Sequence, residues 1–100
     1  MNIEVNGNKA KVEFFKYNNG NTGFKIYDEE GNLLMSPTVD VGYIMNKEYV
    51  TVKNKDKEDT IGKMLKEQGL LQMKADSITL NHGSMLSIYI LSNDARNFLD

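Results

Sequence analysis

DKEDTIGKMLKEQGLL, residues 56–71, decides the fold because it is the one stretch of the chain with the spacing of an amphipathic helix. Ile61, Met64 and Leu65 fall at positions i, i+3 and i+4 and therefore form one apolar stripe. A helix of roughly a dozen residues is marginally stable alone in water, so this stripe must pack against another element. Most of the remaining chain has strand-like patterns, and we expect that element to be a sheet.

Both ends of this stretch carry the signals that begin and end a helix. Asp56 is expected to be the N-cap, with Asp59 three residues later in the position of a capping-box acid. Gly69 stands where a C′ glycine ends a helix, and Leu70 follows it as the apolar contact of such a cap. Because capping accounts for both acids, we interpret them as capping residues and not as an acid–base pair.

Strand-like alternation and tight turns fill the rest of the chain. NGN at 6–8, DEEGN at 28–32 and NHGS at 81–84 are turn signals between apolar runs. Pro37 has no N–H for a strand ladder, so 33–41 is expected to be an edge strand or one interrupted at Ser36-Pro37. The apolar run MLSIYIL at 85–91 is expected to be a central strand covered on both faces. The other expected segments are strands at 3–5, 10–17, 24–27, 49–53 and 77–80, a crossover at 42–47 that carries Tyr43 and Ile44 back across the sheet, and a connection at 72–76.

These segments predict a single α+β domain over residues 1–100. Its expected architecture is a mainly antiparallel, curved sheet of about six or seven strands with one helix packed on it. Residues 92–100 are polar apart from Phe98 and Leu99, and they are expected either to fray or to form one helical turn.

The composition is that of an ordinary globular protein, with 40% apolar and 26% charged residues. The formal net charge is −2 and both signs are interspersed, which disfavours a nucleic-acid partner because such proteins usually carry a basic face. The chain has no cysteine, and so no disulfide, thiolate metal site or thiol nucleophile. No signal-peptide pattern is present, and no apolar run approaches the ~20 residues of a membrane span. We therefore expect a cytoplasmic protein with no membrane partner.

No residue pattern indicates catalysis, a metal site or a bound cofactor. His82 is the single histidine and lies in an expected turn, without a cluster of further zinc ligands. The acids at 28–30 span too short a segment for a calcium loop, and GNTG at 20–23 lacks the lysine of a phosphate loop. KNKDK at 53–57 resembles a small phosphate-contacting patch, but acids follow at once and a solvated segment is favoured. We therefore expect a protein that is not an enzyme.

The aromatic residues are the candidates for a binding surface. Phe15, Tyr17, Tyr27 and Tyr43 are expected to form an exposed protein-contact surface, or else to fill the core in part. The same aromatic face could instead stack on bases, with the phosphates contacted by lysines at 9, 11, 16 and 25.

The chain resembles an uncharacterised family of small proteins, domains of unknown function carried by conjugative elements and phages of gut bacteria. The likeness lies in KVEFFKYNNGNTGFK at 11–25, in TVDV at 38–41 and above all at 48–71. There a strand of the type E-x-V-x-V-K-N leads into an acidic-capped helix that ends L-x-E-x-G-L. MLSIYIL at 85–91 is similar to the last strand of that family. The resemblance implies a mobile-element context and assigns no catalytic residue.

Small size, acidic balance, the missing catalytic groups and this resemblance lead to one functional expectation. The chain is expected to be a small accessory protein of a phage or mobile element that binds a host or element protein stoichiometrically, such as an anti-CRISPR inhibitor of host defence. Two alternatives remain open: a nucleic-acid-binding protein and a protein that sequesters a small ligand. A homodimer through an unpaired edge strand, at 33–41 or in the first strand, is also open.

Overall fold

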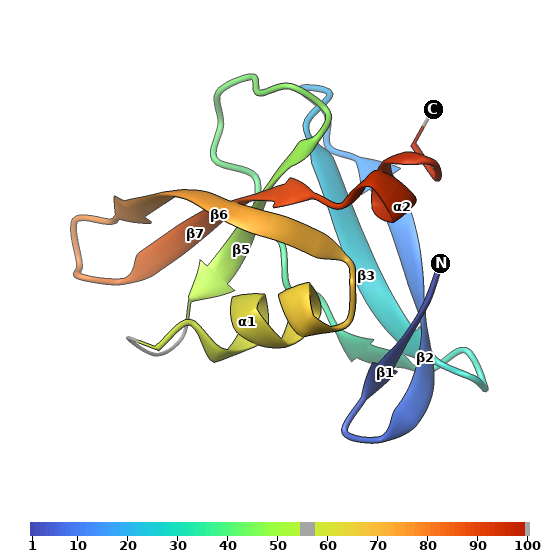
Figure 1. Cartoon of the computed structure of the whole chain (residues 1–100). Coiled ribbons are helices and arrows are strands. Elements are labelled where there is room, and N and C mark those ends of the chain that lie inside the picture. Colours follow the sequence, from blue (N-terminus) through green and yellow to red (C-terminus); the bar gives the residue numbers. More distant parts are fainter. Residues whose placement is uncertain (55–57, 100) are drawn as a thin grey trace.

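The computed structural model describes residues 1–54 and 58–99, and this part of the chain contains seven strands and two helices (Figure 1). The strands are β1 (Asn2–Val5), β2 (Asn8–Lys16), β3 (Thr22–Asp28), β4 (Leu33–Met35), β5 (Tyr49–Asn54), β6 (Leu71–Thr79) and β7 (Met85–Leu91). The helices are α1 (Thr60–Glu67) and α2 (Asn93–Arg96).

The strands form two antiparallel sheets, with the orders β1-β2-β3-β4 and β5-β7-β6. The α+β class is confirmed, whereas the expectation of one curved sheet of six or seven strands is wrong. The chain changes sheets directly after β4. Pro37 accepts a hydrogen bond from Lys53 N–H at 2.8 Å, and Thr38 forms a single bridge to Val52 of β5. Because proline cannot donate to a ladder, β4 ends after three residues and the next segment pairs with the second sheet.

Local signals account for most of the strands and turns. Asn6 and Gly7 both have positive φ, 52° and 81°, as the tight turn between β1 and β2 requires. Along β2, Ala10 and Val12 are buried while the alternate residues of 9–13 face solvent, as the sequence predicts. Strand β7 lies at the centre of its sheet, which confirms the placement of the most apolar run.

One hydrophobic core joins the two sheets and α1. The inner face of the first sheet supplies Phe24 and Ile26, and the second sheet supplies Val50 and Val52. Figure 1 shows the sheets inclined to each other, with α1 lying beside the opening between them. Leu65 of α1 is fully buried in this core. Ile61 and Met64 pack against the same core, so the predicted apolar stripe is confirmed.

The helix itself is shorter than the expected span. Asp56 lies outside the described residues, and α1 begins at Thr60. Asp59 occupies the N-cap position but has a left-handed backbone, with φ at 56°, and its side chain makes no capping hydrogen bond. The capping-box expectation for Asp59 is therefore wrong. At the other end Gly69 has φ at 80°, and Leu70 N–H donates to Leu65 C=O at 3.1 Å, which confirms the glycine cap.

Strand β6 differs most from the expectation. Residues 72–76 are not a connection, because one strand runs from Leu71 to Thr79 along β7. Its central residues are exposed and mostly polar, and two register irregularities interrupt the ladder. A bulged edge strand lacks the simple alternation by which strands are recognised, so the sequence pattern concealed it. After β7, Ser92 Oγ accepts a hydrogen bond from Ala95 N–H at 3.1 Å and begins α2, a single helical turn.

Candidate protein-contact surface

The four aromatic residues predicted as a contact surface lie in two separate places. Phe15 and Tyr27 lie on the outer face of the first sheet, where their direct cross-strand partners are Gly23 and Lys11. Tyr43 lies in the loop between β4 and β5 and borders a groove of the second sheet. The structure therefore does not unite the four residues in one patch.

Phe15 and Tyr17 have a structural role that the sequence did not reveal. Their rings pack edge to face, with centroids 4.9 Å apart, above Gly23. A Cβ at Gly23 would lie 2.6 Å from the Phe15 ring and 2.7 Å from the Tyr17 ring, so the glycine makes room for both. Tyr17 Oη also lies 3.0 Å from Thr38 Oγ1 and ties β2 to the segment that changes sheets. These two half-buried rings therefore cover part of the outer face of the first sheet.

An apolar groove lies on the outer face of the second sheet. Tyr89 of β7 faces α1, so the alternate residues Leu86, Ile88 and Ile90 face the opposite side. Leu86 and its cross-strand partner Ile78 form the floor, with the loop at 39–43 beside them. The groove has a volume of about 290 Å³. We call it the contact groove, and it is lined by Val39, Asp40, Val41, Tyr43, Ile78, Leu80 and Leu86.

Buried Asn21 holds the loop of the contact groove in place. Its side chain, 2% exposed, donates to Tyr43 C=O at 2.7 Å and accepts from Met45 N–H at 2.8 Å. Tyr43 and Ile44, between these anchors, are 53% and 79% exposed. The expectation that residues 42–47 carry them back across the sheet is wrong, because the Asn21 bonds turn this segment outward.

Replacing Asn21 by alanine should lower the free energy of unfolding by about 1–3 kcal/mol, because the part-buried carbonyl of Tyr43 and amide of Met45 would lose their partner. Urea unfolding measures this change, and the Met45 amide should exchange its hydrogen faster than in the wild type. Asn18→Ala, in the same turn but exposed, is the matched control and should change stability by less than about 0.5 kcal/mol. Unchanged exchange at Met45 in the Asn21 variant would contradict this role.

Asp40 supplies the negative charge of the contact groove. Its Oδ1 accepts hydrogen bonds from Asn19 Nδ2 at 2.9 Å, from Gly42 N–H at 3.2 Å and from Asn21 Nδ2 at 3.2 Å. The bond from Asn19 and that from Gly42 are the main reasons why the pKa of Asp40 lies below its usual value. The carboxylate is therefore ionised at neutral pH and held in one orientation.

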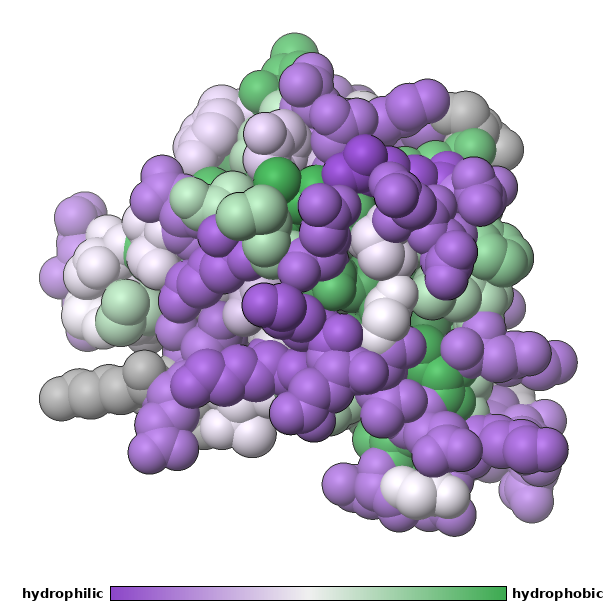
Figure 2. All heavy atoms as spheres, viewed as in Figure 1, coloured by the Kyte–Doolittle hydropathy of each residue, from purple (hydrophilic) through white to green (hydrophobic). Residues whose placement is uncertain are grey.

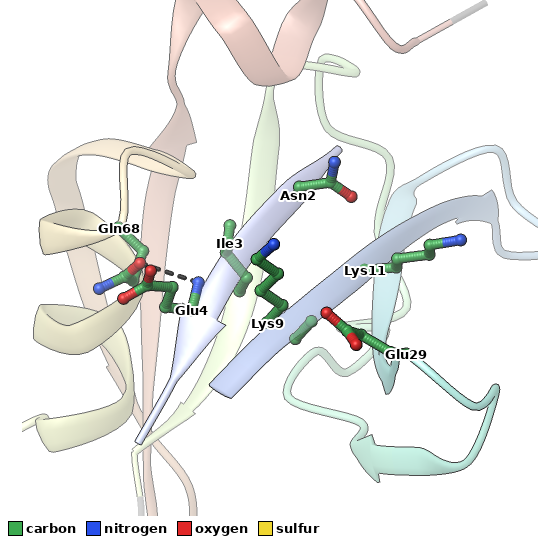
Figure 3. Close-up of a pocket in the computed structure, with 8 residues that line it drawn as sticks. Asn2, Ile3, Glu4, Lys9, Lys11, Glu29 and Gln68 are labelled. Atoms are coloured by element: carbon green, nitrogen blue, oxygen red, sulfur yellow. Dashed lines mark hydrogen bonds between the residues drawn. The ribbon is translucent and has the colours of Figure 1, made fainter. Parts of the chain in front are cut away.

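A second concavity lies on the first sheet, beside β1 and β2. This lysine pocket has a volume of about 620 Å³ and is lined by Asn2, Ile3, Glu4, Lys9, Ala10, Lys11, Glu29 and Gln68. Figure 3 shows Gln68 and Glu4 at one side and Lys11 and Glu29 at the other. Glu4 N–H donates to Gln68 Oε1 at 2.9 Å, which occupies part of the outer edge of β1. Because two exposed lysines are offset by two exposed glutamates, the pocket carries no strong charge of either sign.

A buried ionisable cluster lies where α1 begins. Asp59, 4% exposed, accepts a hydrogen bond of 2.6 Å from Tyr89 Oη and pairs with Lys74 Nζ at 3.5 Å. Burial, and next the hydrogen bond to Asp59, raise the pKa of Tyr89. The three residues come from three segments far apart in the chain, so no local sequence pattern predicted the cluster. It anchors the start of α1 on the second sheet.

The remaining chemical candidates stay apart from one another. His82 is exposed in the turn between β6 and β7, which is closed by the bond from Leu80 N–H to Ser84 C=O at 2.8 Å. Within residues 1–54 and 58–99, no three histidine, aspartate or glutamate side chains gather as they would around a metal ion. In the same residues, no helix has the length and apolarity needed to cross a membrane.

Comparison with known proteins found no match among protein-family models, curated proteins or solved structures.

Proposed function

We propose that this chain works by binding a partner protein non-covalently through the contact groove. The observation that carries this proposal is a loop, held by Asn21, that keeps Tyr43 and Ile44 exposed beside an aliphatic groove. Exposed apolar side chains beside a concave apolar surface are typical of protein-binding sites. The loop held by Asn21 also favours binding, because a segment that is already ordered loses little conformational entropy when a partner binds.

The distribution of apolar residues supports this choice of surface. On the face of the molecule in Figure 2, hydrophilic side chains dominate and apolar atoms appear in small separate patches. The lining of the contact groove has a different composition, with a single fixed carboxylate and six uncharged residues. Aromatic residues such as Tyr43, at the edge of an aliphatic pocket, are frequent sources of binding energy.

The finer version of the proposal concerns the partner. We propose that the chain is an accessory protein of a phage or mobile element and that it inhibits a host defence system, for instance as an anti-CRISPR protein. It draws its support from the resemblance at 48–71 and from the small, acidic chain. Expression in a bacterium that carries an active CRISPR system tests this version, since phage plating should recover if the chain inhibits interference and stay suppressed if it does not.

The double substitution Tyr43→Ser/Ile44→Ser should abolish partner capture while it changes the free energy of unfolding by less than about 0.5 kcal/mol, because both side chains are exposed. The measurement is affinity capture from host lysate, followed by identification of proteins that depend on these two residues. Leu33→Ser/Leu34→Ser is the matched control, because it removes two exposed apolar side chains of the first sheet. The proposed function fails if both variants capture the same proteins as the wild type.

One observation keeps a nucleic-acid role as a second candidate. Lys25 Nζ lies 5.6 Å from the centre of the Phe15 ring, and Lys11 and Tyr27 share the same sheet face. Glu13, the direct partner of Lys25, offsets this charge. Titration with single-stranded and duplex DNA at two salt concentrations decides the matter, because phosphate contacts weaken steeply with salt.

A further inference from the structure

We propose that the partner segment in the contact groove carries an apolar side chain next to a lysine or arginine. This inference rests on the proposed function and names the chemistry of the partner. The apolar side chain would enter between the loop and the β6–β7 hairpin, and the cation would meet Asp40.

The contact groove is small. Pockets for drug-sized ligands have volumes of roughly 300–1,000 Å³. At about 290 Å³ the groove lies at the lower limit of that range, a size that suits one or two side chains of a polypeptide. Six of its seven lining residues carry no charge, so the part of the partner that enters it must be apolar.

The edge of the contact groove is negatively charged. Asp40 is the one charged residue in the lining, and its carboxylate is held by the three hydrogen bonds to Oδ1. All three of these hydrogen bonds go to Oδ1 and none to Oδ2. Lys53, the cross-strand partner of Leu86, lies nearby on β5 but does not line the groove. A partner cation beside the apolar anchor therefore complements the charge of this edge.

The kind of cation that suits this edge follows from the hydrogen bonds of Asp40. A guanidinium binds a carboxylate best when it contacts both oxygens. Because Asp40 Oδ1 already accepts three hydrogen bonds, a partner meets Oδ2 alone. A lysine ammonium makes such a single contact as well as an arginine does, so the groove should accept either residue with similar affinity.

A display library of random twelve-residue peptides, selected on the wild-type protein, tests this assignment directly. We expect the selected peptides to share an aliphatic or aromatic residue within about two positions of a lysine or arginine, with no strong preference between the two cations. Their affinity should fall about tenfold for Asp40→Asn, which removes the charge and keeps an oxygen acceptor. The wild-type affinity should also fall as salt rises, and the affinity of Asp40→Asn should fall less.

The matched control is Asp28→Asn. Asp28 also accepts two loop N–H groups, from Glu30 at 2.9 Å and from Asn32 at 2.8 Å, but it lies at the end of β3 away from the contact groove. This variant should bind the selected peptides as the wild type does. If Asp40→Asn does not fold, the salt dependence of the wild type and exchange of the peptide cation for glutamine still decide the question.

Four results would overturn the assignment. The selected peptides could lack a cation or carry acids, they could bind Asp40→Asn as tightly as the wild type, or no peptide could be selected at all. Concentration-dependent dimerisation that Ile44→Ser abolishes would also overturn it, by showing a second copy in the groove. The peptide results do not bear on the proposed function, which stands or falls on the lysate capture that depends on Tyr43 and Ile44.

Discussion

Replacing Asp59 with alanine should lower the free energy of unfolding by about 1–3 kcal/mol, as expected when a buried hydroxyl loses its hydrogen-bond acceptor. The substitution leaves the buried Tyr89 hydroxyl without its 2.6 Å acceptor and Lys74 without its carboxylate. Alanine also tolerates the left-handed backbone of position 59 less well than aspartate does. Urea unfolding gives the difference in free energy directly.

Two further variants separate the contributions within this cluster. Tyr89→Phe removes one hydroxyl and, combined with Asp59→Ala in a double-mutant cycle, isolates the Asp59–Tyr89 bond. Glu58→Ala removes the preceding acid, which is exposed, and should change stability by less than about 0.5 kcal/mol. A loss below about 1 kcal/mol for Asp59→Ala would show that the cluster does not hold α1.

The same cluster gives an independent readout at high pH. Because the pKa of Tyr89 is higher in the folded protein than in the unfolded chain, the folded state retains its proton where the unfolded state loses it. The stability contributed by this proton is complete below the ordinary tyrosine pKa of about 10 and falls above it by about 1.4 kcal/mol per pH unit. Absorbance titration should show one of the five tyrosines ionising only as the protein unfolds, and Tyr89→Phe should remove that step.

Gly62→Ala should lower the free energy of unfolding by about 1–3 kcal/mol, as overpacking does. In an ordinary helix interior this change stabilises by roughly 1 kcal/mol, so the expected sign is reversed. A Cβ at Gly62 would lie 2.5 Å from Tyr89 Oη and 2.6 Å from Tyr89 Cε2. The ring cannot withdraw easily, because it is buried and its hydroxyl is bonded to Asp59.

Thermal unfolding of Gly62→Ala beside Lys63→Ala provides the comparison. Lys63 is the exposed next residue of α1, and its replacement measures the effect of alanine on the helix without the contact to Tyr89. A raised melting temperature for Gly62→Ala would show that the helix does not approach Tyr89 this closely.

The local sequence pattern predicted a feature correctly wherever all the residues that determine that feature lie within one short segment. The turn at Asn6-Gly7, the glycine cap at Gly69 and the apolar stripe centred on Leu65 each depend on residues within a few positions of one another. The same holds for β7, whose apolar composition alone placed it at the centre of a sheet. Only the end of strand β6 was predicted, at 77–80, and residues 72–76 were missed because their bulged, exposed course leaves no alternation to recognise.

The candidate site was predicted only in part. Tyr43 was singled out from its residue type, and it does border the contact groove. Its distance in sequence from Ile78 and Leu86 gave no indication that they share one surface. Asn21, which holds the loop, belongs to a polar turn whose composition indicates nothing more than a turn.

By itself, then, the amino-acid sequence determined most of the strand segments, most of the turns and where the helix ends, because backbone preference and side-chain periodicity act over a few neighbouring residues. Only the tertiary structure decided that the strands divide into two sheets at Pro37, that Asp59 is buried against Tyr89, and that the loop at 39–43 meets the β6–β7 hairpin to form a groove. These arrangements depend on contacts between residues far apart in the chain, and packing of the whole core selects among the many pairings that local preference allows.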